Sequence, residues 1–139
     1  MNRFIKIGAD GAQLLQEASA AECVAVLDTT RGLMFTTVES EEMTHAQAVQ
    51  YVATLDVAGF KDWRLPTVEE LFLLADRSRS SPAIDTTFFP DCKSDWYWTG
   101  SLYAPSPGDY AWGVGFSSGD AFWGNQLNVG FVRAVRVGQ

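Results

Sequence analysis

The chain has 139 residues and a formal net charge of −7 at pH 7, because 17 acidic side chains outnumber 10 basic ones. Hydrophobic residues make up 47% and charged residues 19%, a balance that excludes an intrinsically disordered chain and suits one domain over residues 1–139. The basic residues are few and scattered, which argues against direct binding to nucleic acid, heparin-like polymers or anionic membranes. An acidic surface suits solubility or a basic protein partner.

The N-terminal residues and the cysteines indicate the cellular compartment. Residues 1–10 lack the apolar centre of a signal peptide, and no apolar run approaches the roughly 18 residues of a membrane span. We therefore expect a cytoplasmic protein, in the cytoplasm of the host cell if a phage encodes it. Cys23 and Cys92 make neither a disulfide framework nor a zinc site, so we expect free thiols that are mostly buried.

Strands and two helices are expected in the first half of the chain. Residues 4–7, 23–27 and 33–38 have the apolar, β-branched character of strands. A capping box marks the start of each helix: Thr44 with Gln47, and Thr67 with Glu70. The residues expected to face the core are Ala48, Val49, Val52 and Leu55 in the first helix and Leu71, Leu74 and Ala75 in the second.

Two further residues belong to the expected first helix. Gly59 suits the left-handed conformation at its end. His45, directly after the cap, is expected on the solvent side. It is the only histidine, so any Ser-His-Asp or Cys-His system would have to use it, and nothing in the sequence points to one.

The second half has the pattern of strands and turns. Residues 96–99 form a short strand. In residues 110–116 large side chains alternate with alanine and glycine, so another element is expected to pack against the bare face. Residues 117–120 form a hairpin turn, 121–123 run back, and 131–137 form the closing strand. Helices early and hairpins late indicate an α+β fold.

Five motifs follow one another in a specific order. They are Asp-Trp-Arg-Leu-Pro at 62–66, Pro-Ala-Ile-Asp-Thr at 82–86, Trp-Tyr-Trp-Thr at 96–99, the aromatic-glycine alternation at 110–116, and Val-Arg-Ala-Val-Arg at 132–136. Together they resemble the Lcl C-terminal domain family, long catalogued as a domain of unknown function, over about residues 22–137. The resemblance implies a C-type lectin-like fold, in which two helices flank a twisted antiparallel sheet and the N- and C-terminal strands pair.

The resemblance also implies an adhesin-like role, since the family includes adhesin domains that bind sulfated glycosaminoglycans. The loop and strand signatures with which many C-type lectins bind calcium are absent, so we expect no metal and no cofactor. Aspartates at positions 85, 91, 95, 109 and 120 are expected to be solvated turn residues. The cysteine motif of the lectin-like formylglycine-generating enzymes is also absent.

Several residues are assigned a structural role. Trp63 should be buried between helices and sheet, and the five donors of Arg64 could tie loop carbonyls or a carboxylate together. Arg133 and Arg136 should point to opposite faces of the closing strand, one of them towards a buried acid. The full structural set is Asp62, Trp63, Arg64, Trp98, Trp112 and Arg133.

The ligand is expected at two loops, residues 102–109 and 120–128, because lectin-like folds display loops over a fixed sheet. Aromatic rings beside amide groups suit recognition of protein surfaces or sugars. The alternative is that Phe122 and Trp123 only cover a sheet edge. The residues assigned to binding are Tyr103, Asp109, Asp120, Phe122, Trp123, Asn125, Gln126 and Asn128.

We therefore expect a non-enzymatic recognition module with no catalytic residues, which binds a protein partner; a glycan ligand and self-association stay open. A phage or mobile-element protein fits this composition: an anti-CRISPR that inhibits a basic nucleic-acid-binding complex and a receptor-binding domain carried by the virion are equally allowed. The rival from another class is a hydrolase built on loop carboxylates, which would need two acids with raised pKa values in a deep pocket.

Overall fold

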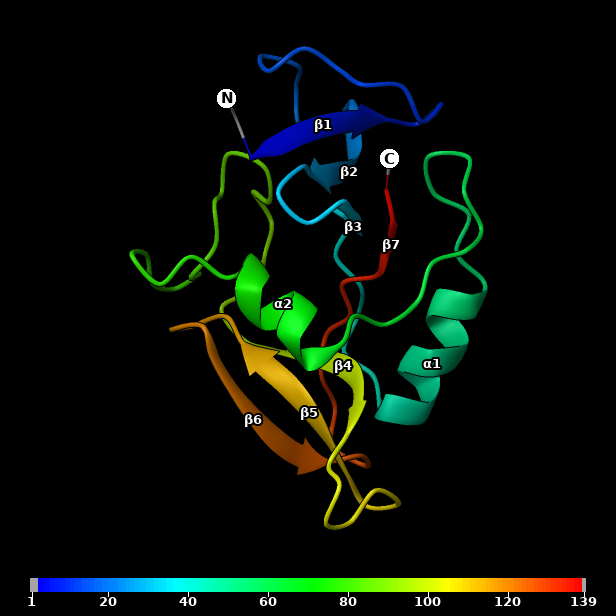
Figure 1. Cartoon of the computed structure of the whole chain (residues 1–139), viewed down its shortest axis with the longest axis vertical. Coiled ribbons are helices and arrows are strands. Elements are labelled where there is room, and N and C mark those ends of the chain that lie inside the picture. Colours follow the sequence, from blue (N-terminus) through cyan, green and yellow to red (C-terminus); the bar gives the residue numbers. More distant parts are fainter. Residues whose placement is uncertain (1–2, 139) are drawn as a thin grey trace.

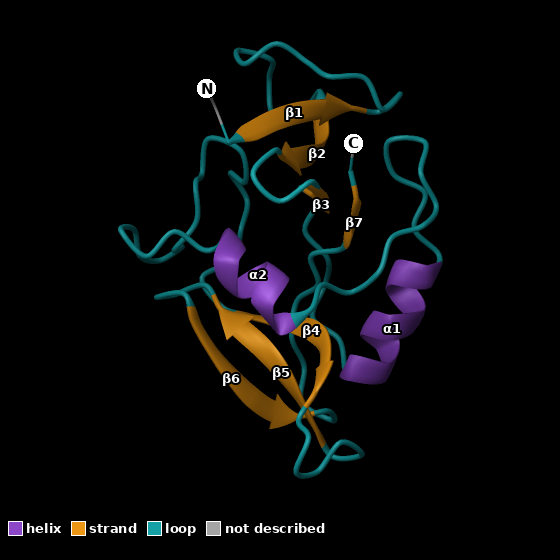
Figure 2. Ribbon diagram, in the orientation of Figure 1, coloured by secondary structure: helices purple, strands orange, loops and turns teal. Residues whose placement is uncertain are grey.

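The computed structural model describes residues 3–138 as an α+β arrangement of two helices and two antiparallel sheets (Figures 1 and 2). The first sheet contains β1 (Phe4–Gly8), β2 (Cys23–Asp28), β3 (Leu33–Thr36) and β7 (Val135–Val137). The second sheet contains β4 (Trp96–Leu102), β5 (Tyr110–Gly115) and β6 (Asp120–Asn125). The helices are α1 (His45–Ala53) and α2 (Val68–Leu74).

The two terminal strands share the first sheet without pairing with each other. The strand order is β1-β2-β3-β7, so β1 and β7 lie at opposite edges (Figure 1). The prediction that they pair is wrong, because β2 uses its two edges for β1 and β3, and β3 then offers its free edge to β7. The closing strand β7 is shorter than the expected residues 131–137. The strands also form two sheets where a single sheet was expected.

Both predicted capping boxes are confirmed. The backbone N–H of Gln47 donates to Thr44 Oγ1 at 3.4 Å, and the N–H of Thr44 donates to Gln47 Oε1 at 2.9 Å. In α2 the same reciprocal bonds join Thr67 and Glu70 at 3.2 and 2.8 Å. These bonds satisfy N–H groups that have no partner inside a helix, so local sequence alone specifies where each helix begins.

The buried face of α1 differs from the predicted one. Ala48 and Val52 are buried, but Val49 is 48% exposed and Leu55 lies beyond the end of the helix. His45 takes the remaining inner position: its Nε2 lies 2.9 Å from the carbonyl oxygen of Thr99, and its ring packs edge-on against Trp98. The prediction that His45 faces solvent is therefore wrong, since spacings of three and four place it on the buried face.

The predictions for α2 and Gly59 had different outcomes. Leu71, Leu74 and Ala75 are buried, as predicted. Gly59 has the expected positive φ of 80°, but it does not end α1. It lies in a tight turn between Val57 and Phe60, whose backbones exchange hydrogen bonds.

The core runs from the first sheet to the second through two groups of side chains. The first group joins β2 and β3 to α2 and β4, and includes Phe35, Leu71 and Tyr97. The second joins the first sheet to α1 and contains Trp63 and Trp98. Between residues 3 and 138, no helix is long and apolar enough to cross a membrane.

Candidate functional site

Strand β6 separates two neighbouring aromatic residues onto opposite faces of the second sheet. Phe122 and Trp123 are each 47% exposed. The predicted return segment at residues 121–123 is confirmed as part of β6, but the binding loop expected over residues 120–128 is wrong in its first part, because residues 120–125 pair with β5 throughout. Phe122 packs on Trp96, with ring centroids 4.3 Å apart, whereas Trp123 packs on Trp112 at 5.5 Å. Only one of the two therefore belongs to any given binding surface.

The Trp123 side carries a cluster of four rings, Tyr103, Tyr110, Trp112 and Trp123, which we call the aromatic face. Tyr103 and Trp123 stack with centroids 4.6 Å apart and an interplanar angle of 14°. Trp112 meets Trp123 edge-on at 5.5 Å and Tyr103 at 5.9 Å, and Tyr110 lies 6.1 Å from Tyr103. Such contacts fix the orientation of rings that are only partly buried.

A groove continues from the aromatic face towards α2. It has a volume of about 400 Å³ and is lined by Val68, Glu69, Phe72, Trp112 and Ala121. Figure 1 shows α2 lying beside the sheet formed by β4, β5 and β6. Side chains of α2 form one wall of this groove, and side chains of the sheet form the other. Its lining is mostly apolar, and Trp112 belongs to both surfaces. The aromatic face and the groove are therefore one continuous surface.

The bare face of β5 lies on the opposite side of this sheet. A Cβ added to Gly113 would lie 2.3 Å from Cζ2 of Trp96, so the indole ring rests directly on the glycine backbone. The prediction that another element packs closely there is confirmed. Trp96 also packs edge-on against Trp98, which is fully buried. The bare face of β5 is thus covered by Trp96, and Phe122 is the exposed ring on this side.

The side chains of two amide residues expected to contact ligand bond to the protein's own backbone. Gln126 Nε2 donates to the carbonyl oxygens of Pro107 at 2.9 Å and Tyr110 at 3.2 Å. Asn125 Oδ1 accepts from the backbone N–H of Leu127 at 2.9 Å. The Gln126 bonds fasten the loop after β4 to the segment that follows β6, whereas the Asn125 bond closes a local turn.

The remaining predicted contacts are spread over the surface. Asp109 accepts from Ser106 Oγ at 2.8 Å and Asp120 from Ser118 Oγ at 2.9 Å, and Asn128 is exposed. Asp109 directly precedes β5 and Asp120 pairs with its last residue, Gly115, so six residue steps of a strand, about 20 Å, separate their positions along β5. The structure therefore does not bring these two carboxylates together.

Asp120 instead lines a smaller pocket of about 150 Å³ with Asp95, Trp96 and Phe122, on the other side of the sheet. The Asp120 carboxylate already accepts a hydrogen bond from Ser118 Oγ. Within the described residues no group of three or more histidines, cysteines and acids could hold a metal ion.

The Asp-Trp-Arg motif lies in a network of structural contacts. Arg64 donates to both carboxylate oxygens of Glu70, at 2.8 and 2.9 Å, and these bonds hold the pKa of Glu70 below its usual value. Trp63 is buried and donates from Nε1 to the carbonyl oxygen of Phe60 at 3.0 Å. Asp62 accepts from Arg136 Nε at 2.6 Å, which lowers the pKa of Asp62.

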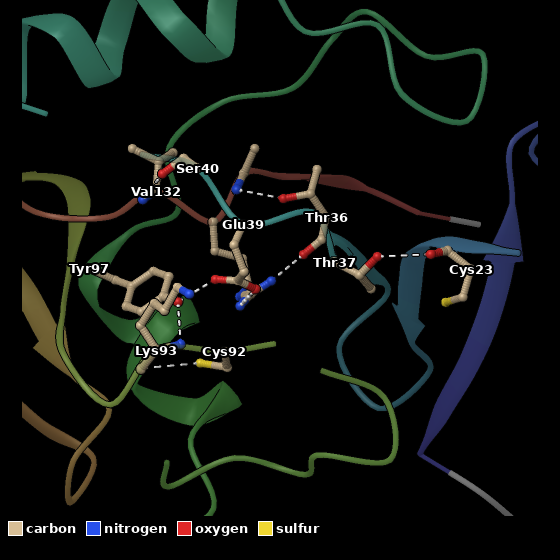
Figure 3. Close-up of polar contacts among 11 residues, drawn as sticks. Cys23, Thr36, Thr37, Glu39, Ser40, Cys92, Lys93, Tyr97 and Val132 are labelled. Atoms are coloured by element: carbon tan, nitrogen blue, oxygen red, sulfur yellow. Dashed lines mark hydrogen bonds and ion pairs between the residues drawn. The ribbon is translucent and has the colours of Figure 1, made fainter. Parts of the chain in front are cut away.

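A second network surrounds Glu39, which lies near Thr36 and Tyr97 (Figure 3). Arg133 is fully buried, with Nη2 2.5 Å from Glu39 Oε2 and Nη1 donating to the carbonyl oxygen of Thr36. The hydroxyl of Tyr97 donates to the other oxygen of Glu39 and accepts from the backbone N–H of Lys93. Burial raises the pKa of Tyr97, which keeps its hydroxyl protonated as a donor.

The cysteines flank a shallow surface groove of about 510 Å³ near this network. Burial raises the pKa of both Cys23 and Cys92, and each thiol lies close to a backbone carbonyl oxygen. A raised pKa lowers the thiolate fraction, which opposes a nucleophilic role.

Three features of the aromatic face and its groove were not identified from the sequence. Glu69, Val68 and Phe72 line the groove, and none of them was assigned to binding. Trp112 was assigned a purely structural role, yet it is half-buried and central to the aromatic face. Tyr110 was assigned to a strand without a role in binding.

No curated protein matches the chain. The family model described as the Lcl C-terminal domain matches residues 24–136, which lie inside the predicted range and include α1, α2 and the whole second sheet. The aromatic face and its groove are therefore built entirely from the matched region. The chain belongs to the Lcl C-terminal domain family.

Proposed function

We propose that this protein is a non-enzymatic recognition module with a C-type lectin-like fold, and that it binds a protein partner through its aromatic face. The single observation that carries the proposal is the stack of Tyr103 on Trp123, braced by Trp112 and open to solvent. Tyrosine and tryptophan dominate the energetic centres of protein interfaces, because they bury a large area at a small cost in side-chain entropy.

The charge of the chain supports a protein rather than a sulfated glycan as the ligand. A net charge of −7 repels sulfate groups and attracts a basic partner. The apolar lining of the groove beside Trp112 favours buried side chains of a protein over the many hydroxyls of a sugar. We propose that this interaction takes place in the cytoplasm.

The shifted pKa values support a binding role over the hydrolase alternative. The residues with resolved shifts include Glu70, Tyr97 and both cysteines, and none of these lines the groove beside Trp112. Catalytic acids and bases are expected in a cleft with shifted pKa values. Here the shifts belong to buried or paired groups elsewhere in the fold.

The test is a quantitative affinity purification from lysate of the source cells, with wild type, Trp123→Ala and Phe122→Ala as bait. Phe122 is the matched control, because it neighbours Trp123, is equally exposed and faces the other way. A protein retained by wild type and Phe122→Ala but lost from Trp123→Ala supports the proposal. A protein lost from Phe122→Ala alone, or no retained protein at all, contradicts it. Circular dichroism checks that each bait is folded.

A further inference from the structure

The groove beside Trp112 contains one charged side chain, and that side chain is unused. Glu69 lines the groove, is exposed, and makes no hydrogen bond or ion pair with any residue from 3 to 138. Its neighbour Glu70 is fully engaged by Arg64 and the capping box. The two adjacent acids therefore differ: one completes the fold, and the other is available to a ligand.

The groups around Glu69 are suited to a cation with an apolar stem. Trp112 supplies an indole ring, and Val68, Phe72 and Ala121 supply apolar walls. A lysine or arginine side chain buries its methylene groups on such walls while its charged head pairs with a carboxylate or lies over a ring. Tryptophan is the aromatic residue that attracts cations most strongly.

The protein already uses this chemistry at the same helix. The guanidinium of Arg77 lies 3.6 Å from the ring centroid of Phe72 and donates to the carbonyl oxygens of Phe72 and Gly119, each at 2.7 Å. Arg77 is thereby held within the fold. Glu69 and the ring of Trp112 have no such cation of their own among the described residues.

We propose that the partner inserts a lysine or arginine side chain into this groove, so that the cation pairs with Glu69 and lies against Trp112. Apolar residues next to that cation then rest on the aromatic face. The inference depends on the proposed function and specifies the partner's chemistry: a protein segment with a basic residue flanked by apolar ones. The net charge of −7 adds long-range attraction for such a segment.

The test uses a random peptide library displayed on phage, selected against the full chain. We expect the selected peptides to combine a lysine or arginine with adjacent apolar residues. For the best peptide, synthesised and titrated calorimetrically, Glu69→Gln should raise the Kd about ten-fold or more, because an interfacial charge loses its partner. Glu17→Gln, an exposed acid remote in sequence, should leave the Kd unchanged. Glu69→Gln changes one atom of an exposed side chain, so we expect it to preserve the fold, which circular dichroism checks.

The outcomes separate this inference from the proposed function. Peptides that lack a basic residue, or whose Kd is the same for Glu69→Gln, overturn the inference; if their binding still requires Trp123, the aromatic face remains the binding surface. Peptides that bind Trp123→Ala and Glu69→Gln as well as wild type overturn both. A library that yields no peptide overturns the inference.

Discussion

The rings of Tyr103 and Trp123 stack nearly parallel, with centroids 4.6 Å apart, although 20 positions separate them along the chain. Tyr103 directly follows β4 and Trp123 lies on β6, so the stack passes over the intervening strand β5. Trp112 of β5 supports it from below through contacts with both rings. The stack therefore links all three strands of the second sheet and orients the surface that we propose for binding.

This stack should contribute a measurable coupling energy. We expect a double-mutant cycle of Tyr103→Ala and Trp123→Ala to give about 0.5–1.5 kcal/mol of coupling in the free energy of unfolding, the range for paired aromatic rings. Urea denaturation followed by circular dichroism measures it. Strictly additive losses would mean that the two rings do not stack in solution.

Close packing of Trp96 on β5 makes Gly113 sensitive to substitution. Gly113→Ala should lower the free energy of unfolding by about 1–3 kcal/mol, because its methyl group would lie 2.3 Å from the indole ring and displace it. Gly108→Ala is the matched control, since a Cβ there meets nothing within 4 Å. Equal stability of the two variants in urea would contradict the packing.

The buried pair of Arg133 and Glu39 should be costly to break. Arg133→Met leaves the Glu39 carboxylate buried with one partner fewer, so we expect a loss of about 3–5 kcal/mol in the free energy of unfolding. Arg133→Lys retains the charge and should lose less. As a surface control, Arg79→Ala removes the exposed pairs with Asp76 and Asp85 and should cost about 1 kcal/mol or less. A similar loss for Arg133→Met and Arg79→Ala would contradict the burial of Arg133.

The pairing of Arg64 with Glu70 predicts a specific dependence of stability on pH. The pKa of Glu70 is lowered from 4.5 in the folded state, so its contribution is present above pH 4.5 and is lost as the pH falls through the lower folded-state pKa. Urea midpoints should therefore fall more steeply below pH 4.5 for wild type than for Glu70→Gln. Glu17→Gln should match wild type. Parallel curves for wild type and Glu70→Gln would show that Glu70 is not paired in solution.

Local features of the fold were predictable from the sequence, and long-range pairings were not. Thr44 and Thr67 correctly predict the starts of their helices, because a capping box lies within four residues. His45 has the spacing of the buried face, but the carbonyl oxygen of Thr99 that satisfies its ring there lies 54 positions away and could not be read from the sequence. Glu39 could not be identified as the buried acid, since Arg133 is 94 positions distant. The positions of β1 and β7 in the strand order likewise depend on which strand edges stay free in the folded sheet.

The binding surface was predictable in its residue types but not in its geometry. Tyr103 and Trp123 stood out as aromatic residues near turns, and they do meet. Phe122 was grouped with them because residues 120–128 were treated as one binding loop although 121–123 were expected to run back, and pairing with β5 places the ring of Phe122 on the opposite face. Gln126 looked suited to a ligand, yet its amide donates to Pro107 and Tyr110, contacts that arise only when the loop closes.

Photo-crosslinking in the source cells tests the central claim most directly. The photo-reactive amino acid benzoylphenylalanine replaces Trp123 in one variant and Phe122 in the other, so that two neighbouring positions probe opposite faces of β6. We predict a protein adduct from position 123 and none from position 122. The variant at position 123 must still retain the protein in the affinity purification, which the aromatic rings of benzoylphenylalanine favour. An adduct from position 122 alone, or none from position 123 in a variant that retains the protein, would contradict the claim that the aromatic face binds a protein partner.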